Sequence, residues 1–123
     1  MAAAPPLSVP LSELIAARFQ VLADPMRIRL LDRLREGEAT GQRLAAELGS
    51  SQQNVSRHLG LLHQAGVLRR RRQGPFVHYA IGDESVLELC ELVCGGLERR
   101  LAELGGALAG GAPGGRGGGR GLA

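Results

Sequence analysis

Apolar positions in the first third of the chain repeat with the period of α-helices. Residues 11–23 show this period and predict a first helix. Asp24 and Pro25 begin a second helix, because aspartate accepts backbone hydrogen bonds at an N-cap and proline suits the first helical position. Gly37 marks the end of this second helix. Its expected inner face consists of Met26, Leu30, Leu31 and Leu34.

The middle of the chain predicts two short helices that are separated by a tight turn. The first covers residues 40–48 and is followed by Gly49, a typical C-terminal stop. Ser50 begins the second helix, and with Gln53 it fits the spacing of a capping box. The apolar face of this second helix is formed by Val55, Leu59 and Leu62. Two helices of this length with this turn predict a helix-turn-helix.

Beyond these helices the apolar pattern changes from a helical period to alternation. Residues 76–81 alternate, and a turn separates them from the arginine-rich run before them, which predicts a β-hairpin. The expected turn residues are Gln73, Gly74 and Pro75. A long helix over residues 83–104 follows, with one continuous apolar stripe. The stripe consists of Val86, Leu89, Cys90, Val93, Cys94, Leu97, Leu101 and Leu104.

The pattern therefore predicts one folded domain over residues 11–104, with a mainly α (α+β) fold of winged helix-turn-helix type. Residues 1–10 are rich in alanine and proline, and we expect a flexible N-terminal segment there. Residues 105–123 are rich in glycine, whose backbone entropy opposes folding, so we expect a disordered tail. A core of this size is small, and dimerisation would add buried surface.

The distribution of charge changes the picture more than the modest net charge of +3. Residues 48–82 contain no aspartate or glutamate, yet they contain Arg57 and the run of arginines at 69–72. Acidic residues are frequent again in residues 83–104. A basic segment that coincides with a helix-turn-helix and a hairpin indicates a face that binds a polyanion, and the hairpin is then the wing.

The outer face of the second short helix carries polar side chains that suit DNA. Gln53 can pair bidentately with adenine and Arg57 with guanine in the major groove. Ser56 and the helix N-terminus suit phosphate, and the wing would hold flanking phosphates or the minor groove. The predicted DNA-binding residues are Ser51, Gln52, Gln53, Asn54, Ser56, Arg57, Arg70, Arg71, Arg72 and Gln73.

Other interpretations of these residues stay open at the level of sequence. Gln53 would serve only as a capping partner if the capping box is its whole role. Independently of Gln53, the alternative for the arginine run at 69–72 is a merely solvated strand. His58 is expected to be packed or hydrogen-bonded at the helix edge, whereas His63 and His78 are expected at the surface; none of them has a clustered partner for a metal.

The chain resembles the ArsR/SmtB family of bacterial winged-helix repressors. The resemblance covers roughly residues 11–104 and is carried by three stretches: LADPMRIRLLDRL, LAAELGSSQQNVSRHLGLLHQAGVL and RRRQGPFVHYAI. It implies a homodimer that pairs through the first and last helices. It also implies binding to an imperfectly palindromic double-stranded DNA operator, repression, and release of DNA when an inducer binds.

The metal sites of that family do not carry over to this sequence. The stretch EATGQ, residues 38–42, stands where some members have a thiolate motif on the third helix. Of the zinc-type site on the last helix only Asp83 is matched, with Ser85, Gly96 and Arg99 at the other places. One carboxylate does not make a zinc site. No cofactor follows with certainty from the sequence.

The two cysteines offer another kind of sensor. Cys90 and Cys94 are four residues apart, so their sulfurs lie on one helix face, one turn apart. Two such thiolates, with further thiols from a partner subunit, would bind a soft thiophilic ion such as As(III), Cd(II) or Cu(I). The alternatives are an oxidation or persulfide switch, and cysteines that only pack a dimer interface as small apolar side chains.

Several classes of protein are disfavoured. The beginning of the chain is not a convincing signal peptide, and no apolar stretch has the length of a membrane span, so we expect a cytoplasmic protein. No catalytic triad order or phosphate loop stands out, and we expect no enzyme. Two rivals remain: a winged helix that contacts only protein, and a DNA-binding regulator without a small-molecule effector.

Overall fold

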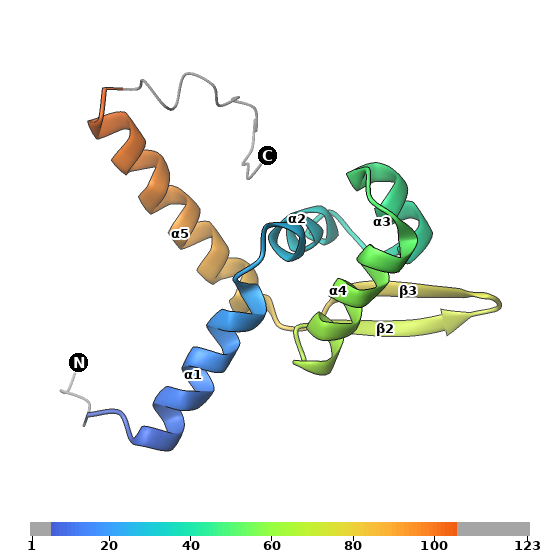
Figure 1. The fold of residues 1–123 in the computed structure, drawn as a ribbon, viewed down its shortest axis with the longest axis horizontal. Coiled ribbons are helices and arrows are strands. Elements are labelled where there is room, and N and C mark those ends of the chain that lie inside the picture. Colours follow the sequence, from blue (N-terminus) through green and yellow to red (C-terminus); the bar gives the residue numbers. More distant parts are fainter. Residues whose placement is uncertain (1–5, 106–123) are drawn as a thin grey trace.

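The computed structural model describes residues 6–105 and shows a winged helix-turn-helix (Figure 1). The elements follow in the predicted order, with one additional short strand. They are α1 (Val9–Leu22), α2 (Pro25–Leu34), β1 (Ala39–Thr40), α3 (Gly41–Leu48), α4 (Gln52–Gln64), β2 (Leu68–Gln73), β3 (Phe76–Ile81) and α5 (Glu84–Glu103). Residues 106–123 of the predicted disordered tail, which was expected to begin at 105, and residues 1–5 of the predicted flexible segment lie outside the described residues.

The hydrophobic core lies where α2, α3 and α4 pack on one face of the small sheet. The predicted inner face of α4 is confirmed, because Val55, Leu59 and Leu62 are all completely buried. Full burial of such a side chain contributes about 1.5–3 kcal/mol, so these residues fix the orientation of α4. The largest fully buried side chains are Leu30, Leu31, Leu44, Leu59, Leu62, Val55 and Val67.

The sheet has three antiparallel strands in the order β1-β3-β2. Strand β1 was not predicted, since two residues are too short to show any alternation; it pairs Ala39 with Tyr79. The predicted hairpin is confirmed, but its turn is tighter than expected. Gln73 still pairs with Phe76 at the end of the ladder, which leaves a two-residue turn. Gly74 has a φ of 61°, the left-handed value that such a hairpin turn needs at its first central position.

The start of α4 differs from the predicted capping box. Ser51 is the N-cap, and its Oγ accepts a hydrogen bond from Asn54 N over 3.0 Å. Ser50 belongs to the end of α3, where its N–H donates to Ala45 O. Its Oγ instead accepts from Asn54 Nδ2. The interpretation of Gln53 as a capping partner of Ser50 is therefore wrong.

The N-terminal boundary of the domain is also earlier than predicted. Helix α1 begins at Val9, with Pro10 in its first turn, because Ser8 is an N-cap whose Oγ accepts from Leu11 N. The last two residues of the predicted flexible segment are thus helical. At the other end, α5 matches the predicted long helix, with Asp83 as N-cap and Leu104 as C-cap.

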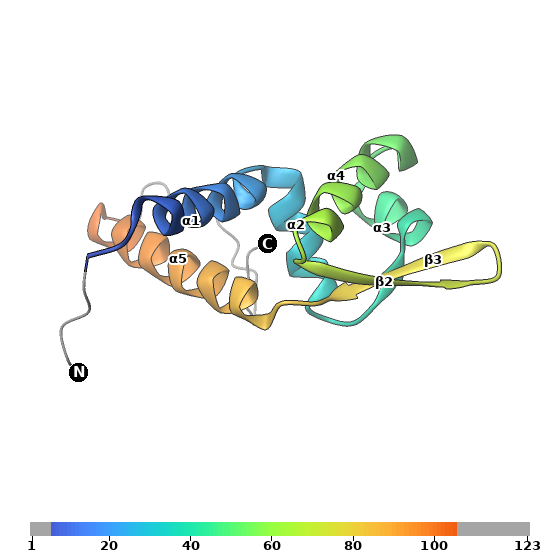
Figure 2. The same cartoon turned by 90° about the horizontal axis from the view of Figure 1, so that it is seen from below.

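Helices α1 and α5 extend away from the winged domain at the end opposite the hairpin tip (Figures 1 and 2). They are less buried than the other helices, and each has one buried residue, Leu22 and Val86 respectively. Large apolar side chains remain exposed along both: Leu11, Leu14, Ile15 and Phe19 on α1, and Val93 and Leu97 in the stripe of α5. The apolar stripe of α5 is thus only half covered within one chain.

Candidate nucleic-acid interface

The outer face of α4 presents the polar residues that the sequence analysis assigned to DNA. Because Val55 and Leu59 point into the core, the helical period turns Gln52, Gln53 and Ser56 outward, and all three are exposed. Ser51 is exposed at the N-terminus of the helix, where unpaired backbone N–H groups favour an anion. The face is thus uniformly polar and carries no acid.

Arg57 lies along this face rather than extending from it. Its Nη2 donates to Asn54 Oδ1 over 2.9 Å and lies 3.3 Å from His58 Nε2. Asn54 is half-buried at the edge of the helix and donates from Nδ2 to Ser50 Oγ. The guanidinium of Arg57 is therefore exposed but held by neighbours on its own helix.

One arginine of the wing shares a groove with α4. This groove, with a volume of about 330 Å³, joins the outer face of α4 to the beginning of β2. It is lined by Ser56, Arg57, Gly60, Leu61, His63, Gln64 and Arg70. Arg57 belongs to α4 and Arg70 to β2, and the fold brings both to one concave basic surface. His63 takes part in this groove and is half-buried rather than fully at the surface.

The four wing arginines do not form one cluster, because alternate side chains of a strand point to opposite faces. Arg70 pairs with Tyr79 and Arg72 with Val77, so both share the face that also covers the core. Arg69 and Arg71 lie on the other face. The four arginines of β2 are therefore divided between two faces of the strand.

Arg71 has a partner that the sequence analysis missed. Its Nη2 lies 2.5 Å from Glu38 Oε1, and its Nη1 donates to Gln73 Oε1 over 2.9 Å. The hydrogen bond from Arg71 lowers the pKa of Glu38 below its ordinary value. Glu38 directly precedes β1, and only the pairing of β1 with β3 brings it to this face. His78 is half-buried on the same face.

His58 is buried behind the DNA-facing surface, with 4% of its area exposed. Its Nδ1 lies 3.2 Å from Arg27 Nη1 and 3.8 Å from Asp24 Oδ2. Burial lowers the pKa of His58, while the nearby Asp24 carboxylate opposes that effect. The prediction of a packed, hydrogen-bonded histidine is confirmed.

Cys90 and Cys94 line a second hollow, about 450 Å³ in volume, between α1, α2 and α5. Apart from the two thiols its lining is apolar: Phe19, Leu22, Ala23, Ile28, Leu89, Val93 and Leu97. Burial is the largest cause of a raised pKa at Cys90, and the Asp32 and Glu91 carboxylates add to it. Within a single chain, the protonated thiol form of Cys90 is therefore favoured over the thiolate. Within residues 6–105, no three histidine, cysteine, aspartate or glutamate side chains group as a metal site.

No helix within the described part of the chain is long and apolar enough to cross a membrane.

Comparison with known proteins gives relatives of one kind. A family model described as a helix-turn-helix domain matches residues 22–71. The HTH-type transcriptional regulator Rv0081 of Mycobacterium tuberculosis is 37% identical over 97 residues, which cover 78% of this chain and 85% of the relative. Its crystal structure superposes on this chain with a TM-score of 0.70 and 36% identity. The superposition covers 78% of this chain and 97% of the chain in the crystal. These relatives are transcriptional regulators rather than enzymes.

Two further solved structures support the assignment. The homodimeric winged helix-turn-helix domain of Mb0332 from Mycobacterium bovis, a possible ArsR-family regulator, has a TM-score of 0.70 and 29% identity, covering 82% of this chain and 94% of that one. The antimony-specific transcriptional repressor AntR has a TM-score of 0.74 and 33% identity, with coverages of 81% and 91%. With its helix order, basic wing and polar recognition helix, the chain belongs to the ArsR/SmtB family of winged helix-turn-helix transcriptional repressors.

Proposed function

We propose that the protein is a homodimer that binds a double-stranded DNA operator through α4 and the β2–β3 wing and leaves it when an effector binds. The observation that carries this proposal is the groove in which Ser56 and Arg57 of α4 meet Arg70 of β2. A surface that is concave, basic and free of acid over two elements suits the phosphate backbone and an exposed base edge.

Each predicted contact has a distinct role in this proposal. Gln53 and Arg57 read base edges in the major groove, and Gln52 and Asn54 flank them. Ser51 and Ser56 contact phosphate near the helix N-terminus. The wing residues Arg70, Arg71, Arg72 and Gln73 hold the flanking backbone or minor groove, with Arg70 and Arg72 on the face that adjoins α4.

The exposed apolar faces of α1 and α5 support the homodimer. Phe19 of α1 and Leu97 of α5 both line the thiol-containing hollow, yet they are 51% and 59% exposed in one chain. Apolar surface of this extent on two neighbouring helices favours association with a second copy. A two-fold dimer would present two α4 helices to two half-sites about one helical turn apart.

The test of DNA recognition is fluorescence anisotropy with labelled DNA from the protein's own promoter region. We expect operator binding that weakens steeply with salt, because arginines displace counterions from phosphates. A scrambled duplex of equal length is the control, and it should bind with much lower affinity. Equal affinity for both duplexes would overturn sequence-specific recognition, and binding without salt dependence would overturn the basic groove as the contact surface.

Cys90 and Cys94 are proposed as the effector site, with As(III) or another soft thiophilic ion as the effector. Three observations support this: the two thiols line one hollow, that hollow lies against the proposed dimer helices, and the structural relative AntR is antimony-specific. A bound ion would offset the raised pKa of Cys90, because metal binding releases the thiol proton. An oxidation or persulfide switch is the second candidate, and it uses the same two sulfurs.

The effector is tested by adding arsenite, Cd(II), Zn(II) or a mild oxidant separately to the reduced protein–operator complex. We expect arsenite or Cd(II) to release the wild type and to leave the Cys90→Ser/Cys94→Ser double variant bound. Release by the oxidant alone would identify a redox switch instead. If the double variant binds and responds as the wild type does, the cysteines only pack the interface.

A further inference from the structure

The buried imidazole of His58 lies between two guanidinium groups from different helices. On one side, Arg27 Nη1 of α2 is 3.2 Å from Nδ1. On the other side, Arg57 Nη2 of α4 is 3.3 Å from Nε2. The carboxylate of Asp24, the N-cap of α2, lies 3.8 Å from Nδ1. The ring thus faces Arg27 and Asp24 with one nitrogen and Arg57 with the other.

Hydrogen-bond chemistry forbids both arginine contacts at the same time. A guanidinium group has only donors, whereas a neutral imidazole has one acceptor nitrogen and one N–H. His58 can therefore accept from Arg27 or from Arg57, but not from both. A doubly protonated ring would accept from neither, and burial disfavours that form because it lowers the pKa of His58.

The two neutral tautomers correspond to two different states of Arg57. With the proton on Nε2, Nδ1 accepts from Arg27, and Arg57 keeps only its hydrogen bond to Asn54 Oδ1. With the proton on Nδ1, the charge of the Asp24 carboxylate 3.8 Å away favours that N–H, and Nε2 accepts from Arg57. The first tautomer leaves Arg57 more available to a base edge than the second does.

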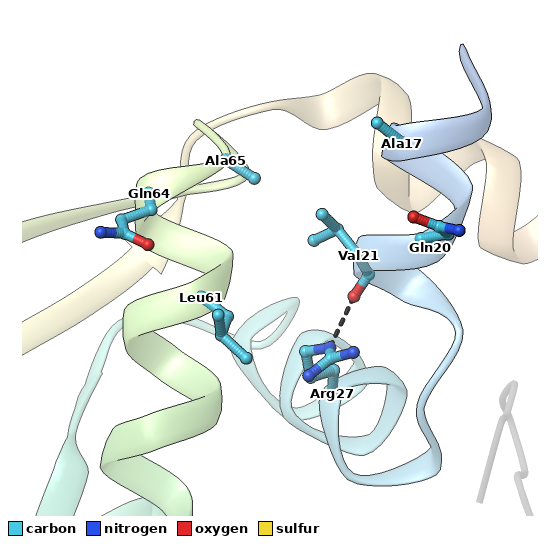
Figure 3. Close-up of a pocket in the computed structure, with 7 residues that line it drawn as sticks. All are labelled: Ala17, Gln20, Val21, Arg27, Leu61, Gln64 and Ala65. Atoms are coloured by element: carbon cyan, nitrogen blue, oxygen red, sulfur yellow. Dashed lines mark hydrogen bonds between the residues drawn. The ribbon is translucent and has the colours of Figure 1, made fainter. Parts of the chain in front are cut away.

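The position of Arg27 depends on the end of α1. Its Nε donates to Val21 O over 2.6 Å, across the junction between α1 and α2. Figure 3 shows this bond in a cleft of about 420 Å³, with Ala17 and Gln20 of α1 on one side and Leu61 and Gln64 of α4 on the other. A shift of α1 would therefore move the guanidinium group that competes for His58.

We propose that His58 is a positioning residue that accepts a hydrogen bond from Arg27 or from Arg57, but not from both. When Arg27 donates to Nδ1 of His58, the side chain of Arg57 is released from the ring and can contact DNA. The role links α1, a helix of the proposed dimer face, to a base-reading side chain. It rests on the proposed function, in which Arg57 contacts the operator.

The first test is a double-mutant cycle on operator affinity with the full chain. Arg27→Met removes the donor to Nδ1 and should weaken binding about fivefold, the effect of one typical hydrogen bond. In an Arg57→Ala background the same change should alter affinity by less than about twofold, because the two residues act through one ring. Arg29→Met, on the same helix, is the control for loss of charge: Arg29 donates to Leu48 O rather than to His58, so its effect on affinity should be the same with Arg57 or with alanine at position 57.

The outcomes distinguish a failure of the DNA-reading role of Arg57 from a failure of the positioning role of His58. If Arg57→Ala does not change operator affinity, the proposed DNA-reading role of Arg57 fails, and the positioning role fails with it. If Arg57→Ala weakens binding but Arg27→Met costs the same in both backgrounds, only the positioning role of His58 is overturned. Arg27→Lys keeps a donor and should restore part of the lost affinity, and the thermal midpoint of each variant checks its fold.

The second test reads the tautomer directly by ¹⁵N NMR of the imidazole ring. In the operator complex we expect Nδ1 to be the unprotonated nitrogen of His58. In DNA-free Arg27→Met we expect the proton to be on Nδ1, because the competing donor is gone and Asp24 remains. The same tautomer in both samples would overturn the proposal, whatever the affinity measurements show.

Discussion

Arg71 and Glu38 form an ion pair, with 2.5 Å between Nη2 and Oε1, on the face of the sheet that points away from the groove of Arg70. The pair consists of exposed groups, so solvent screens it and it adds little to folding stability. Its effect is on function, because it neutralises one of the wing arginines near the proposed DNA surface. Arg70, its neighbour in β2, lines the groove with α4 and forms no ion pair within residues 6–105.

We therefore predict that changes at Arg70, Arg71 and Glu38 affect DNA affinity differently. Arg70→Ala should weaken DNA binding and reduce the slope of log affinity against log salt by about 1, because one phosphate contact is lost. Arg71→Ala should have a smaller effect. Glu38→Gln should strengthen binding, since it frees Arg71 and removes a negative charge. Salt titrations of the three variants check this; equal losses for Arg70→Ala and Arg71→Ala would show that the two faces are not distinct.

A second prediction concerns base readout by Arg57. If the contact is bidentate, Arg57→Ala should weaken operator binding by about 1–3 kcal/mol and relax specificity at one base pair. The measurement is a set of operator duplexes that each carry one substituted base pair. Uniform weakening across all duplexes would show that Arg57 contacts phosphate only.

A third prediction concerns the apolar face of α5. Leu97 is 59% exposed in one chain, and an aspartate in its place would put a charge into the proposed dimer interface. Leu97→Asp should raise the dimer dissociation constant about a hundredfold or more, because two leucine side chains lose their burial. Sedimentation measures the association state. The control is Leu92→Asp, on the opposite side of α5 from the stripe, which should remain dimeric.

A fourth prediction concerns acid stability. Hydrogen bonds from Arg33 and Arg43 lower the pKa of Glu47 from its ordinary 4.5 to about 2. Because the folded-state pKa is the lower one, the stabilisation is present above pH 4.5 and is lost as the pH falls toward 2. Glu47→Gln should therefore lower the thermal midpoint only slightly at pH 7, because solvent screens this partly exposed group, and it should lose less stability on acidification than the wild type does. Glu36→Gln, at an exposed position on the loop between α2 and β1, should behave as the wild type. A wild-type pH profile for Glu47→Gln would contradict the assignment.

The sequence alone determined the order of the elements and most of their ends. Asp24 with Pro25 begins α2, Gly49 ends α3, and Val55 to Leu62 orient α4. These features are predictable because capping, left-handed glycines and helical periodicity act between residues a few positions apart. The polar outer face of α4 follows from the same periodicity.

Where two local solutions competed, the sequence could not decide between them. Ser50 and Ser51 are both good N-caps by residue type, but Ser50 N–H closes the end of α3 and Ser51 Oγ caps α4. Ser8 is likewise an N-cap that a proline-rich context concealed. Such choices depend on the neighbouring element, which a pattern within one segment does not contain.

Only the tertiary structure decided which charged and polar groups meet. Strand β1 brings Glu38 to Arg71, and the packing of α4 on α2 places His58 between Arg57 and Arg27. The fold also joins Arg70 to the groove of α4 and turns Arg71 away from it. These contacts join residues that are distant in sequence, and burial and strand register, rather than local propensity, determine their geometry.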